Sequence, residues 1–371
     1  MKIGVNSRIY QEENAGVQNY IKNLYKDILE INTRDDYLFF QTNDNKKLGQ
    51  TDYFKLPQNS LFAMLFDNFL VSWLDFKHKP DLFHACANVL PIIRRKKCKY
   101  VVTIYDLAPI ISRRYSPSYL FRQYFKWNTK RSAKSADLII TISKNTKKDL
   151  IKYFSIDPKK IKVIYPGVSQ KYFLENDSNV VKKKSSKKYF FSVTTNPRRK
   201  NIISVLKIIS KNKSFFKDYK YRIAGLIQEE ELENINKIMQ KYKLEEVVEL
   251  LGYVSDRELK KLYRRAEFFI YPSLYEGFGL PLVEAMASSC LAIGANNSSM
   301  VEIMPDERFL VDPYDLNDIF FKMKRVILMP RAEKQKIINL NFNYVKRFDW
   351  QMAAKKFIKS LRRLNKNYEA E

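Results

Sequence analysis

The sequence predicts an α/β protein built from two doubly wound domains, each with a parallel sheet covered by helices on both faces. Two observations carry this prediction. Short apolar runs alternate with helix-length amphipathic segments along the whole chain, and strands separated by helices form βαβ units, which build parallel sheets. The length of 371 residues exceeds what a single hydrophobic core ordinarily fills, so two domains are expected.

The expected strands form two series. The first series is Lys2–Asn6, Tyr37–Phe40, Tyr100–Ile104, Leu138–Ile142 and Lys162–Ile164. The second series is Tyr189–Val193, Tyr221–Ala224, Val248–Leu251, Phe268–Tyr271 and Leu291–Gly294. Helices are expected between them, for example Ala15–Ile31 and Asp256–Ala266. The polar stretch from Ser169 to Lys188 has the composition of a linker and separates the two series.

Composition narrows the class of protein. A net charge of +27 predicts attraction to nucleic acid, an anionic membrane surface or phosphorylated substrates; the alternative is a lysine-rich surface without such a partner. The basic residues are dispersed and follow no nucleic-acid-binding motif, so no specific nucleic acid is expected. Three cysteines, odd in number and widely spaced, argue against a disulfide framework or a zinc site and suit a reducing cytosol.

Neither a signal peptide nor a membrane span is expected. The first residues read as a strand, without the charged and apolar regions of a signal peptide. The most apolar window begins at Leu61, but Asp67, Asn68 and Asp75 interrupt it. It is also shorter than the roughly 20 residues that a spanning helix needs.

The segment "YPSLYEGFGLPLVEAMA", residues 271 to 287, follows a predicted strand. It therefore lies at the carboxyl end of the sheet, where open parallel sheets bind ligands. Gly277 and Gly279 allow the main chain to approach a ligand closely, and Pro281 suits the first position of a helix, where its missing N–H costs nothing. The N–H groups and dipole of such a helix start favour an anion, for which a diphosphate is a good candidate.

Two carboxylates, Glu276 and Glu284, flank this turn. Like charges repel, so neither is expected to contact phosphate; a carboxylate instead matches a vicinal diol. Two diols on either side of a diphosphate describe a nucleotide sugar. The alternative is an ordinary βα turn in which the helix dipole favours Glu284.

A second loop supplies cations. "NPRRKNI" follows the strand that ends at Val193, and Arg198, Arg199 and Lys200 offer donors to phosphate oxygens that would stabilise a leaving nucleoside diphosphate. A solvated basic turn is the alternative. His84, which ends a strand-like segment, is placed either at the acceptor side of the site or in a structural hydrogen bond.

These segments resemble family-4 retaining glycosyltransferases of the GT-B fold, in the branch that includes bacterial O-antigen and capsule mannosyltransferases. The similarity runs in order through "AGVQNYIKNL", "DLFHACANVLP", "VVTIYDLAPI", "ADLIITISKNTKKDL", "KIKVIYPGV", "NPRRKN", "LGYVSDRELKKLYRRAEFFIYPSLYEGFGLPLVEAMA" and "FDWQMAAKKF". It implies two Rossmann-like domains facing each other across a cleft: an acceptor-side domain at 1–168 and a nucleotide-sugar-binding domain at 169–349. A C-terminal helix near residues 350–371 is expected to cross back onto the first domain.

The resemblance also assigns roles to residues. Glu276 would contact the donor sugar and Glu284 the ribose, as the two ends of the E-x7-E motif, while Arg199 and Lys200 would neutralise the diphosphate. The other donor-side positions are the loop glycine beside the first helix and the main chain of the second loop: Gly16, Gly277, Phe278, Gly279 and Leu280.

The sequence departs from the family's pattern at two places. Relatives often have a histidine before the aspartate of the segment that reads "TIYDL" here, where Tyr105 precedes Asp106. Tyr105 would replace that histidine through a hydroxyl contact, or the role is dispensable; Asp106 would be an acceptor-side group or a structural one. Thr194 and Thr195 stand near the place where some relatives carry an arginine.

The implied activity is the retaining transfer of a hexose to a growing surface glycan linked to polyprenyl diphosphate. GDP-mannose is the expected donor, with UDP sugars and GDP-rhamnose as alternatives. The sequence has no metal-ligand spacing, so no metal or other cofactor is expected. Aromatic and basic residues interleave from Leu61 and from Ser112, which suits a cytoplasmic protein held peripherally at the anionic inner face of a membrane; ordinary helix packing is the alternative.

Three other classes of protein compete with this interpretation. A glycoside hydrolase would use paired carboxylates as acid and base, but it does not need an anion-binding helix start between them. A nucleic-acid-binding protein would explain the charge of +27 through nonspecific attraction alone. A non-catalytic scaffold with a degenerate site is the third, and the intact pair Glu276 and Glu284 argues against it.

Overall fold

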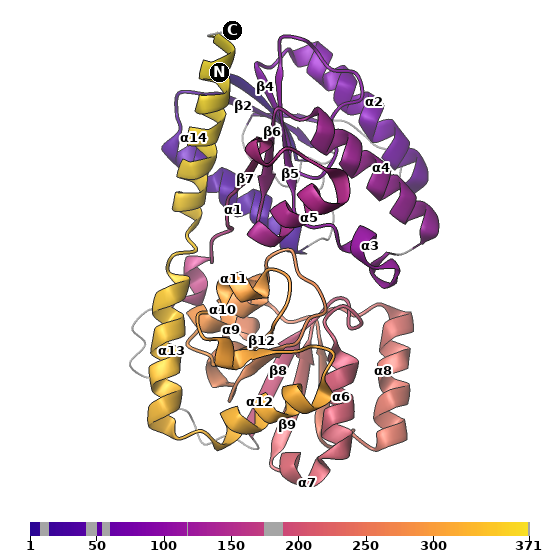
Figure 1. Cartoon of the computed structure of the whole chain (residues 1–371), viewed down its shortest axis with the longest axis vertical. Helices are drawn as coiled ribbons and strands as arrows, with labels where there is room; N and C mark the ends of the chain where they lie inside the picture. Colours follow the sequence, from indigo (N-terminus) through magenta and orange to yellow (C-terminus); the bar gives the residue numbers. More distant parts are fainter. Residues whose placement is uncertain (8–14, 42–49, 54–59, 117, 174–187, 370–371) are drawn as a thin grey trace. The chain divides into compact units, whose positions relative to one another are not determined.

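The computed structural model describes the chain apart from residues 8–14, 42–49, 54–59, 117, 174–187 and 370–371. The chain folds into two compact units (Figure 1). The first unit consists of Met1–Gly167 together with Phe348–Glu371, and the second consists of Val168–Arg347. Both units are doubly wound α/β structures with parallel sheets, so the predicted fold class is confirmed.

The first unit contains a seven-stranded sheet in the order β3-β2-β1-β4-β5-β6-β7. Its strands are β1 (Lys2–Asn6), β2 (Asp36–Gln41), β3 (Gln50–Tyr53), β4 (Leu82–Ala85), β5 (Lys99–Ile104), β6 (Leu138–Thr141) and β7 (Ile161–Val163). Its helices are α1 (Ala15–Ile31), α2 (Ser60–His78), α3 (Ala108–Ile111), α4 (Tyr119–Ser135), α5 (Lys144–Phe154) and α14 (Trp350–Glu369).

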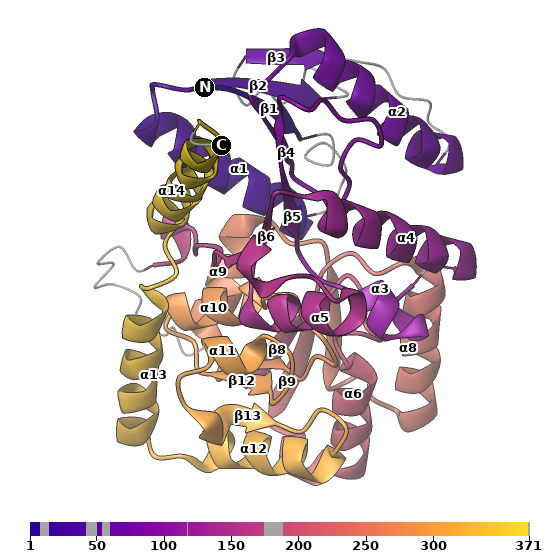
Figure 2. The same cartoon turned by 45° about the horizontal axis from the view of Figure 1, so that its top comes forward.

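Alternate residues of β4 bury their side chains on opposite faces of this sheet, as the period of a strand requires. Phe83 packs in a core cluster with Val71 and Leu74 of α2 and with residues of α4 and α5. His84, the next residue, faces Phe357 of α14 on the other side, where α14 lies beside α1 (Figure 2). Helices therefore cover both faces of the sheet.

The return of the chain to the first unit depends on one glycine. A Cβ atom on Gly167 would lie 2.3 Å from the main-chain nitrogen of Trp350, where α14 begins. No side chain fits in that space. Tyr165 and Phe348 pack edge to face beside it, with ring centroids 5.7 Å apart.

The second unit contains a six-stranded sheet in the order β10-β9-β8-β11-β12-β13. Its strands are β8 (Lys188–Val193), β9 (Tyr219–Ala224), β10 (Val248–Gly252), β11 (Phe269–Tyr271), β12 (Ala292–Ala295) and β13 (Leu310–Val311). Its helices are α6 (Ile202–Lys211), α7 (Lys213–Phe216), α8 (Glu229–Tyr242), α9 (Asp256–Arg265), α10 (Leu280–Ala287), α11 (Met300–Ile303), α12 (Leu316–Leu328) and α13 (Arg331–Val345).

Stacked aromatic rings hold the centre of this sheet together. Phe190 of β8 stacks on Phe268 with centroids 4.9 Å apart, and on Tyr221 of β9 at 5.0 Å. All three rings are fully buried. The region from which the site's loops emerge is thus fixed by apolar packing, which is worth on the order of 1 kcal/mol per ring pair beyond area burial.

Two features of the second unit differ from expectation. Strand β13 was not predicted, because two residues are too few to show a periodic pattern. The start of the predicted linker is instead folded: Gln170–Tyr172 forms a 3₁₀ turn, and Tyr172 is buried against Tyr263 of α9 with ring centroids 6.0 Å apart. The rest of the predicted linker, at 174–187, lies outside the described residues.

Strand β3 was also not predicted, since its sequence "QTDY" is largely polar. Among the described helices, none is long and apolar enough to cross a bilayer.

Candidate active site

The two loops that carry the predicted donor residues lie next to each other. β8 and β11 are neighbouring parallel strands, with Phe191 opposite Phe269, so the loops that follow them emerge at the same edge of the sheet. The main-chain oxygen of Arg199 accepts a hydrogen bond from the Leu274 N–H at 2.8 Å and another from the Ser273 hydroxyl at 3.0 Å. Hydrogen bonds thus join the basic turn to the acidic loop.

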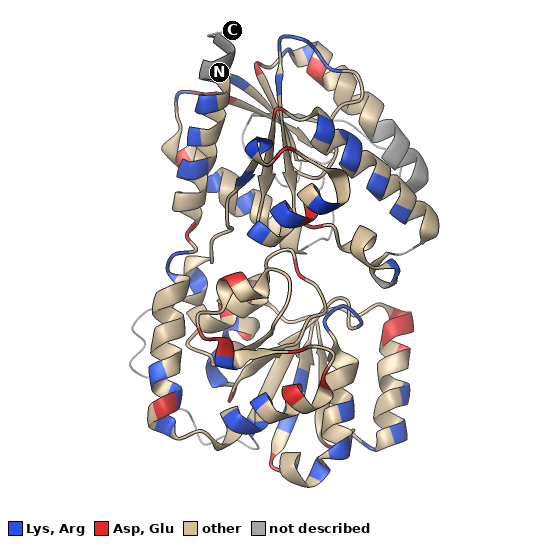
Figure 3. Cartoon of the chain, viewed as in Figure 1, with Lys and Arg blue, Asp and Glu red and all other residues tan. Residues whose placement is uncertain are grey.

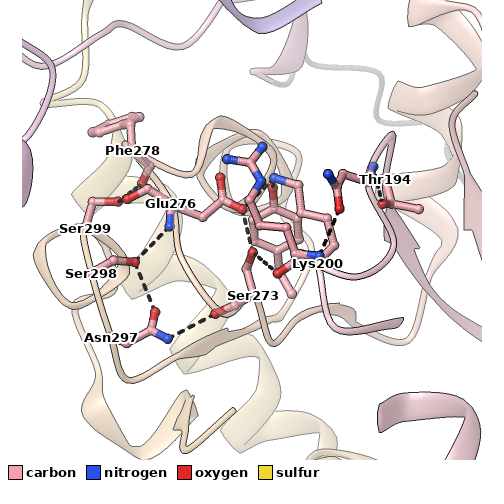
Figure 4. A network of polar contacts seen from close by, with 11 residues as sticks. Thr194, Lys200, Ser273, Glu276, Phe278, Asn297, Ser298 and Ser299 are labelled. Carbon is pink, nitrogen blue, oxygen red and sulfur yellow. Dashed lines mark hydrogen bonds and ion pairs between the residues drawn. The ribbon is translucent and has the colours of Figure 1, made fainter. Parts of the chain in front are cut away.

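Glu276 lies at the centre of this arrangement (Figure 4). Its Oε1 atom accepts hydrogen bonds from Lys200 Nζ and from the Ser273 hydroxyl, each at 2.5 Å. Lys200 also donates to the Tyr271 hydroxyl and lies 4.7 Å from the centre of that ring. Glu276 and Lys200 are both buried, so the site holds a desolvated ion pair rather than two solvated surface charges.

Opposing effects set the charge of Glu276. Burial raises the pKa of this carboxyl, but the positive charges of Lys200 and Arg199 and the hydrogen bonds from Lys200 and Ser273 outweigh it, so the pKa falls below its ordinary value. The side chain is therefore an ionised acceptor at neutral pH.

A third loop supports the acidic one. The Glu276 N–H donates to the Ser298 hydroxyl at 3.0 Å, and the Ser299 hydroxyl donates to the main-chain oxygens of Glu276 and Phe278 at 3.0 and 2.9 Å. Asn297 Nδ2 donates to the Leu274 carbonyl at 2.9 Å. The sequence analysis missed these residues, although their place directly after a predicted strand, in "ANNSSM", was a usable signal.

The basic turn is built around Asn196. Its side-chain oxygen accepts from the Arg199 N–H at 3.0 Å, its carbonyl accepts from the Lys200 N–H, and its own N–H donates to the Thr194 hydroxyl at 3.1 Å. Arg198 points elsewhere, since it forms ion pairs with Glu230 and Glu231 of α8. The turn thus directs Arg198 towards α8 and Lys200 towards Glu276.

Helix α10 begins directly after the acidic loop, and its N-cap is Gly279 with φ +101°. Residues with a Cβ atom rarely adopt this conformation, and a Cβ atom here would also lie 3.0 Å from Ile303 Cδ1. No side chain caps the helix. Phe278 is buried. Pro281 is the second residue of α10, one position later than predicted but still in the first turn, where its missing N–H costs no helical hydrogen bond.

Glu284 lies on α10 in a different environment from Glu276. It is half-buried, and its Oε2 atom accepts a hydrogen bond of 3.4 Å from the Tyr263 hydroxyl. Burial raises the pKa of Glu284 to about 8, with Asp256 adding to the rise and Lys171 opposing it. The surroundings of the two glutamates of the motif therefore shift their pKa values in opposite directions.

Four of the predicted residues, Gly16, His84, Tyr105 and Asp106, lie in the first unit. Gly16 is the second residue of α1 rather than part of a loop beside it, is exposed, and among the described residues no atom lies within 4 Å of the place where its Cβ atom would stand. Asp106 accepts a hydrogen bond of 2.9 Å from the Ala108 N–H at the start of α3. The Tyr105 hydroxyl is buried, has no hydrogen-bond partner in the described part of the chain, and its ring packs edge to face on Tyr20.

His84 is enclosed in the first unit. Its Nδ1 atom lies 2.5 Å from the Tyr25 hydroxyl and its Nε2 atom lies 2.8 Å from the Thr103 hydroxyl. The ring is buried, and burial lowers its pKa to about 3. Both nitrogens are engaged in the core, so these contacts favour the structural alternative for His84 over contact with an acceptor.

Within the described ranges, no group of three or more His, Cys, Asp or Glu side chains is placed to hold a metal ion.

Solved structures that resemble this chain identify its fold. Sucrose-phosphate synthase from Thermosynechococcus elongatus aligns with a TM-score of 0.79 at 17% identity, over 100% of both chains. WaaG, a glycosyltransferase involved in lipopolysaccharide biosynthesis, aligns with a TM-score of 0.76 at 12% identity, over 95% of this chain and 98% of that chain. The two parallel α/β units therefore have the GT-B fold.

Family descriptions match both units: "Glycosyltransferase Family 4" matches residues 33–171, and "Glycosyl transferases group 1" matches residues 174–341. The O-antigen chain mannosyltransferase RfbU of Salmonella typhimurium is 30% identical over 263 residues, covering 71% of this chain and 68% of the relative. The chain belongs to glycosyltransferase family 4.

Two further relatives share part of their length with this chain. The serotype-specific mannosyltransferase WbdA of Escherichia coli is 27% identical over 238 residues, which is 62% of this chain but 29% of WbdA. An N-acetylgalactosamine-N,N'-diacetylbacillosaminyl-diphospho-undecaprenol 4-alpha-N-acetylgalactosaminyltransferase of Campylobacter jejuni is 30% identical over 199 residues, covering 52% of this chain and 51% of the relative. The chain thus spans less than a third of WbdA and about half of the Campylobacter enzyme.

Proposed function

We propose that this glycosyltransferase moves mannose from GDP-mannose to a growing surface glycan linked to polyprenyl diphosphate, with retention of configuration and without a metal ion. The observation that carries the proposal is the buried pair of Lys200 and Glu276 beside the glycine-capped start of α10. At one edge of a parallel sheet, it combines a cation, a carboxylate that can accept hydrogen bonds from sugar hydroxyls, and a helix N-terminus.

In this proposal Lys200 and Arg199 neutralise the diphosphate, and the main chain from Gly277 to Leu280 contributes N–H groups to it. Lys200 holds Glu276 ionised although it is buried, so that Glu276 accepts hydrogen bonds from the sugar hydroxyls. Interactions fixed in a dry site before the reaction cost no reorganisation when charge develops on the leaving group.

Glu284 holds the ribose. It is more accessible than Glu276 and stands on α10, which begins at the diphosphate site. A ribose diol donates best to a deprotonated carboxylate, so binding of the nucleotide displaces the proton that burial favours on Glu284. The family resemblance assigns a diphosphate contact to Gly16 of α1, and the proposal keeps that assignment.

The reaction breaks the bond between the sugar's anomeric carbon and the diphosphate oxygen and forms one to an acceptor hydroxyl on the same face. The transition state resembles an oxocarbenium ion, and the acceptor's proton passes to the departing diphosphate. Arg199 and Lys200 stabilise the charge of that leaving group. Tyr105, whose hydroxyl has no partner among the described residues, and Asp106 orient the acceptor.

Donor and acceptor classes come from the relatives. RfbU and WbdA are named as mannosyltransferases, which supports mannose. The Campylobacter relative is named for an acceptor on diphospho-undecaprenol, which supports a lipid-linked glycan. That relative transfers N-acetylgalactosamine, so a UDP sugar is the second candidate donor, and GDP-rhamnose is the third.

The test is calorimetric binding of GDP, UDP, ADP and dTDP to the purified protein, with and without Mg²⁺, followed by transfer from the matching labelled sugar nucleotide. The proposal expects selective GDP binding that Mg²⁺ does not change, and transfer of label from GDP-mannose with the α-linkage of the donor retained. Preference for UDP would overturn the donor assignment and leave the mechanism in place. Binding of none of the four would overturn the site.

A further inference from the structure

The first residues of the second unit pack against helix α10. The 3₁₀ turn Gln170–Tyr172 contacts this helix, and the hydroxyl of Ser288, the C-cap of α10, donates a hydrogen bond of 3.3 Å to the Tyr172 carbonyl. The Ser288 N–H also donates to the Glu284 carbonyl at 3.0 Å. Tyr172 is therefore attached to the turn of α10 that begins at Glu284.

Two tyrosine hydroxyls reach the Glu284 carboxylate. The Tyr263 hydroxyl of α9 lies 3.4 Å from Glu284 Oε2, and the Tyr172 hydroxyl forms a second hydrogen bond with the same carboxylate. The two rings pack edge to face, with centroids 6.0 Å apart and planes at 81°. Both side chains are buried, so close packing fixes the position of each ring.

Both hydroxyls act as hydrogen-bond donors. Burial raises the pKa of Tyr172 and of Tyr263, so both remain protonated and donate to the carboxylate. Burial also raises the pKa of a third tyrosine, Tyr271 of β11, to which Glu284 adds, but the Tyr271 hydroxyl accepts from Lys200. A carboxylate has about four lone-pair sites, so the two tyrosines leave room on half-buried Glu284 for two further hydroxyl groups.

Charged residues are spread over the helices of the second unit (Figure 3), and two of them act on Glu284. Burial is the main cause of its raised pKa; Lys171 lowers this pKa, Asp256 raises it, and the hydrogen bonds from Tyr263 and Tyr172 lower it. Lys171 and Asp256 form an exposed ion pair of 2.5 Å with each other. Solvent screens such a pair, so the two tyrosines are the buried groups that favour the ionised carboxylate.

We propose that Tyr172 is a positioning residue of the donor site: its hydroxyl, together with that of Tyr263, holds the Glu284 carboxylate in the orientation that receives the ribose diol of the nucleotide. A glutamate side chain is flexible, and without fixed donors it would have to be ordered at the moment of binding, which costs affinity. The enzyme thus distinguishes a ribonucleotide from its 2′-deoxy analogue with the help of a tyrosine that acts through Glu284.

The inference rests on the proposed function, in which Glu284 holds the ribose, and goes further by naming the residues that orient this carboxylate. A purely structural role for Tyr172 is the competing explanation, because its ring packs on Tyr263 and its carbonyl accepts from Ser288. Tyr172→Phe keeps both of these contacts and removes only the hydroxyl. This variant therefore separates the two roles.

The experiment is calorimetric binding of GDP and UDP, each compared with its 2′-deoxy analogue, to the full chain between pH 6 and pH 9. The proteins are the wild type, Tyr172→Phe, Tyr263→Phe and Glu284→Gln. Tyr221→Phe is the matched control, because Tyr221 is a buried tyrosine of the same unit whose hydroxyl donates to Ser192 at 2.9 Å rather than to Glu284. Thermal unfolding shows whether each variant keeps its fold.

The wild type is expected to bind GDP more tightly than 2′-deoxy-GDP. In Tyr172→Phe the Kd for GDP at neutral pH should rise about fivefold to tenfold, as for the loss of a hydrogen bond to a charged group, and the preference over the deoxy analogue should shrink. The pH profile of GDP binding should also move to higher pH, because Glu284 loses a donor to its ionised form. Tyr263→Phe should cause smaller changes in the same direction, since its hydrogen bond is long at 3.4 Å.

Nucleotide binding by Tyr172→Phe that matches the Tyr221→Phe control would overturn the proposal. An equal loss for GDP and its deoxy analogue with an unchanged pH profile would also overturn it, because that pattern indicates disturbed packing. The wild type separates this proposal from the proposed function. Binding of neither GDP nor UDP rejects the donor site, and equal affinity for the ribonucleotide and its deoxy analogue rejects the ribose contact of Glu284. A wild-type preference that Tyr172→Phe retains rejects only the positioning role.

Discussion

Lys200 and Glu276 form a 2.5 Å ion pair inside the second unit, and this pair joins the turn after β8 to the loop after β11. Neither charge is solvated, so each depends on the other. The pair is at once a structural contact and the centre of the proposed donor site, and substitutions at the two positions separate these roles.

Replacing Glu276 should reduce turnover more than nucleotide binding. Glu276→Gln keeps the volume and one hydrogen-bond acceptor but removes the charge, so kcat should fall by orders of magnitude while the Kd for GDP changes less than tenfold. Glu276→Ala should also lower the free energy of unfolding by about 3–5 kcal/mol, because Lys200 is left buried without its partner. Steady-state kinetics measure kcat, calorimetry measures the Kd for GDP, and urea unfolding measures the free energy of unfolding. A kcat of Glu276→Gln close to that of the wild type would contradict the contact between Glu276 and the donor sugar.

Replacing Lys200 should impair the departure of the diphosphate. Lys200→Ala removes a preorganised cation, and the loss of one such group costs about 10²–10³ in kcat. Lys200→Arg restores the charge with a different shape and should recover part of the rate. Arg198→Ala is the matched control, because Arg198 is paired with Glu230 and Glu231. A loss of less than tenfold in Lys200→Ala would indicate that the turn is only a structural cation site.

Nucleotide affinity should depend on pH through Glu284. Its pKa is raised to about 8 in the free protein, whereas a bound ribose favours the carboxylate. GDP binding should therefore tighten as the pH rises from 6 to 9 in the wild type. Glu284→Gln should bind GDP more weakly at high pH and lose this dependence. Calorimetry across this range tests both outcomes, and an unchanged pH profile in the variant would reject contact between Glu284 and the ribose.

Glu284 should also make stability depend on pH, but in the opposite direction: the free energy of unfolding should fall as the pH rises. Between the ordinary pKa of 4.5 and about 8, the folded protein retains a proton that the unfolded chain has lost, so the contribution of Glu284 to stability falls as the pH rises. The free energy of unfolding of Glu284→Gln, relative to the wild type, should increase from pH 5 to pH 8. Urea unfolding at the two pH values measures this difference, and a constant difference would show that Glu284 is not protonated in the folded state.

Two glycine substitutions should separate strain from ligand contact. Gly279→Ala places a Cβ atom at φ +101° and 3.0 Å from Ile303, and such strain costs on the order of 1–3 kcal/mol. Gly16 is the second residue of α1 and no described atom stands where the Cβ atom of Gly16→Ala would lie, so alanine should be tolerated there with a gain below the roughly 1 kcal/mol of a helix interior. Thermal unfolding should show opposite shifts, while the Kd for GDP should rise in Gly16→Ala if this residue borders the diphosphate.

His84 should matter for stability rather than for catalysis. Its pKa is about 3 in the folded protein and 6.5 ordinarily, so the unfolded chain binds a proton first as the pH falls, and stability is lost between these values. His84→Phe should flatten this acid-dependent loss while leaving KM for the acceptor unchanged. An increased KM would return His84 to the acceptor side of the site.

The donor loops could be predicted from sequence because their residue types have strict local requirements. Gly279 needs a left-handed conformation, Pro281 marks a helix start, and cations follow the neighbouring strand. The hydrogen bond that Ser298 accepts from the Glu276 N–H and the one that Ser299 donates to the Glu276 carbonyl could not be predicted in this way. Serines occur in most loops, and only the adjacency of β11 and β12 brings these two to Glu276.

The orientation of single residues was also beyond sequence reasoning. His84 was left between two alternatives, since the residue pattern of "DLFHAC" does not show which sheet face it occupies or that Tyr25 and Thr103 flank it. Tyr172 was placed in a linker because polar neighbours dominate its segment, yet the tertiary contact with Tyr263 folds it into the second unit. In both cases the deciding contact comes from a distant part of the chain.

The first unit is built from two separate segments of the chain, and this affects the order in which the nascent chain can fold. The ribosome makes residues 1–167 first, but Tyr25 of α1 and His84 of β4 can pack against Phe357 only when α14 has been synthesised. The second unit, which is continuous from Val168 to Arg347, is complete before that. Domains generally fold as units in the order of their synthesis, and here the first unit to emerge is the last to be completed.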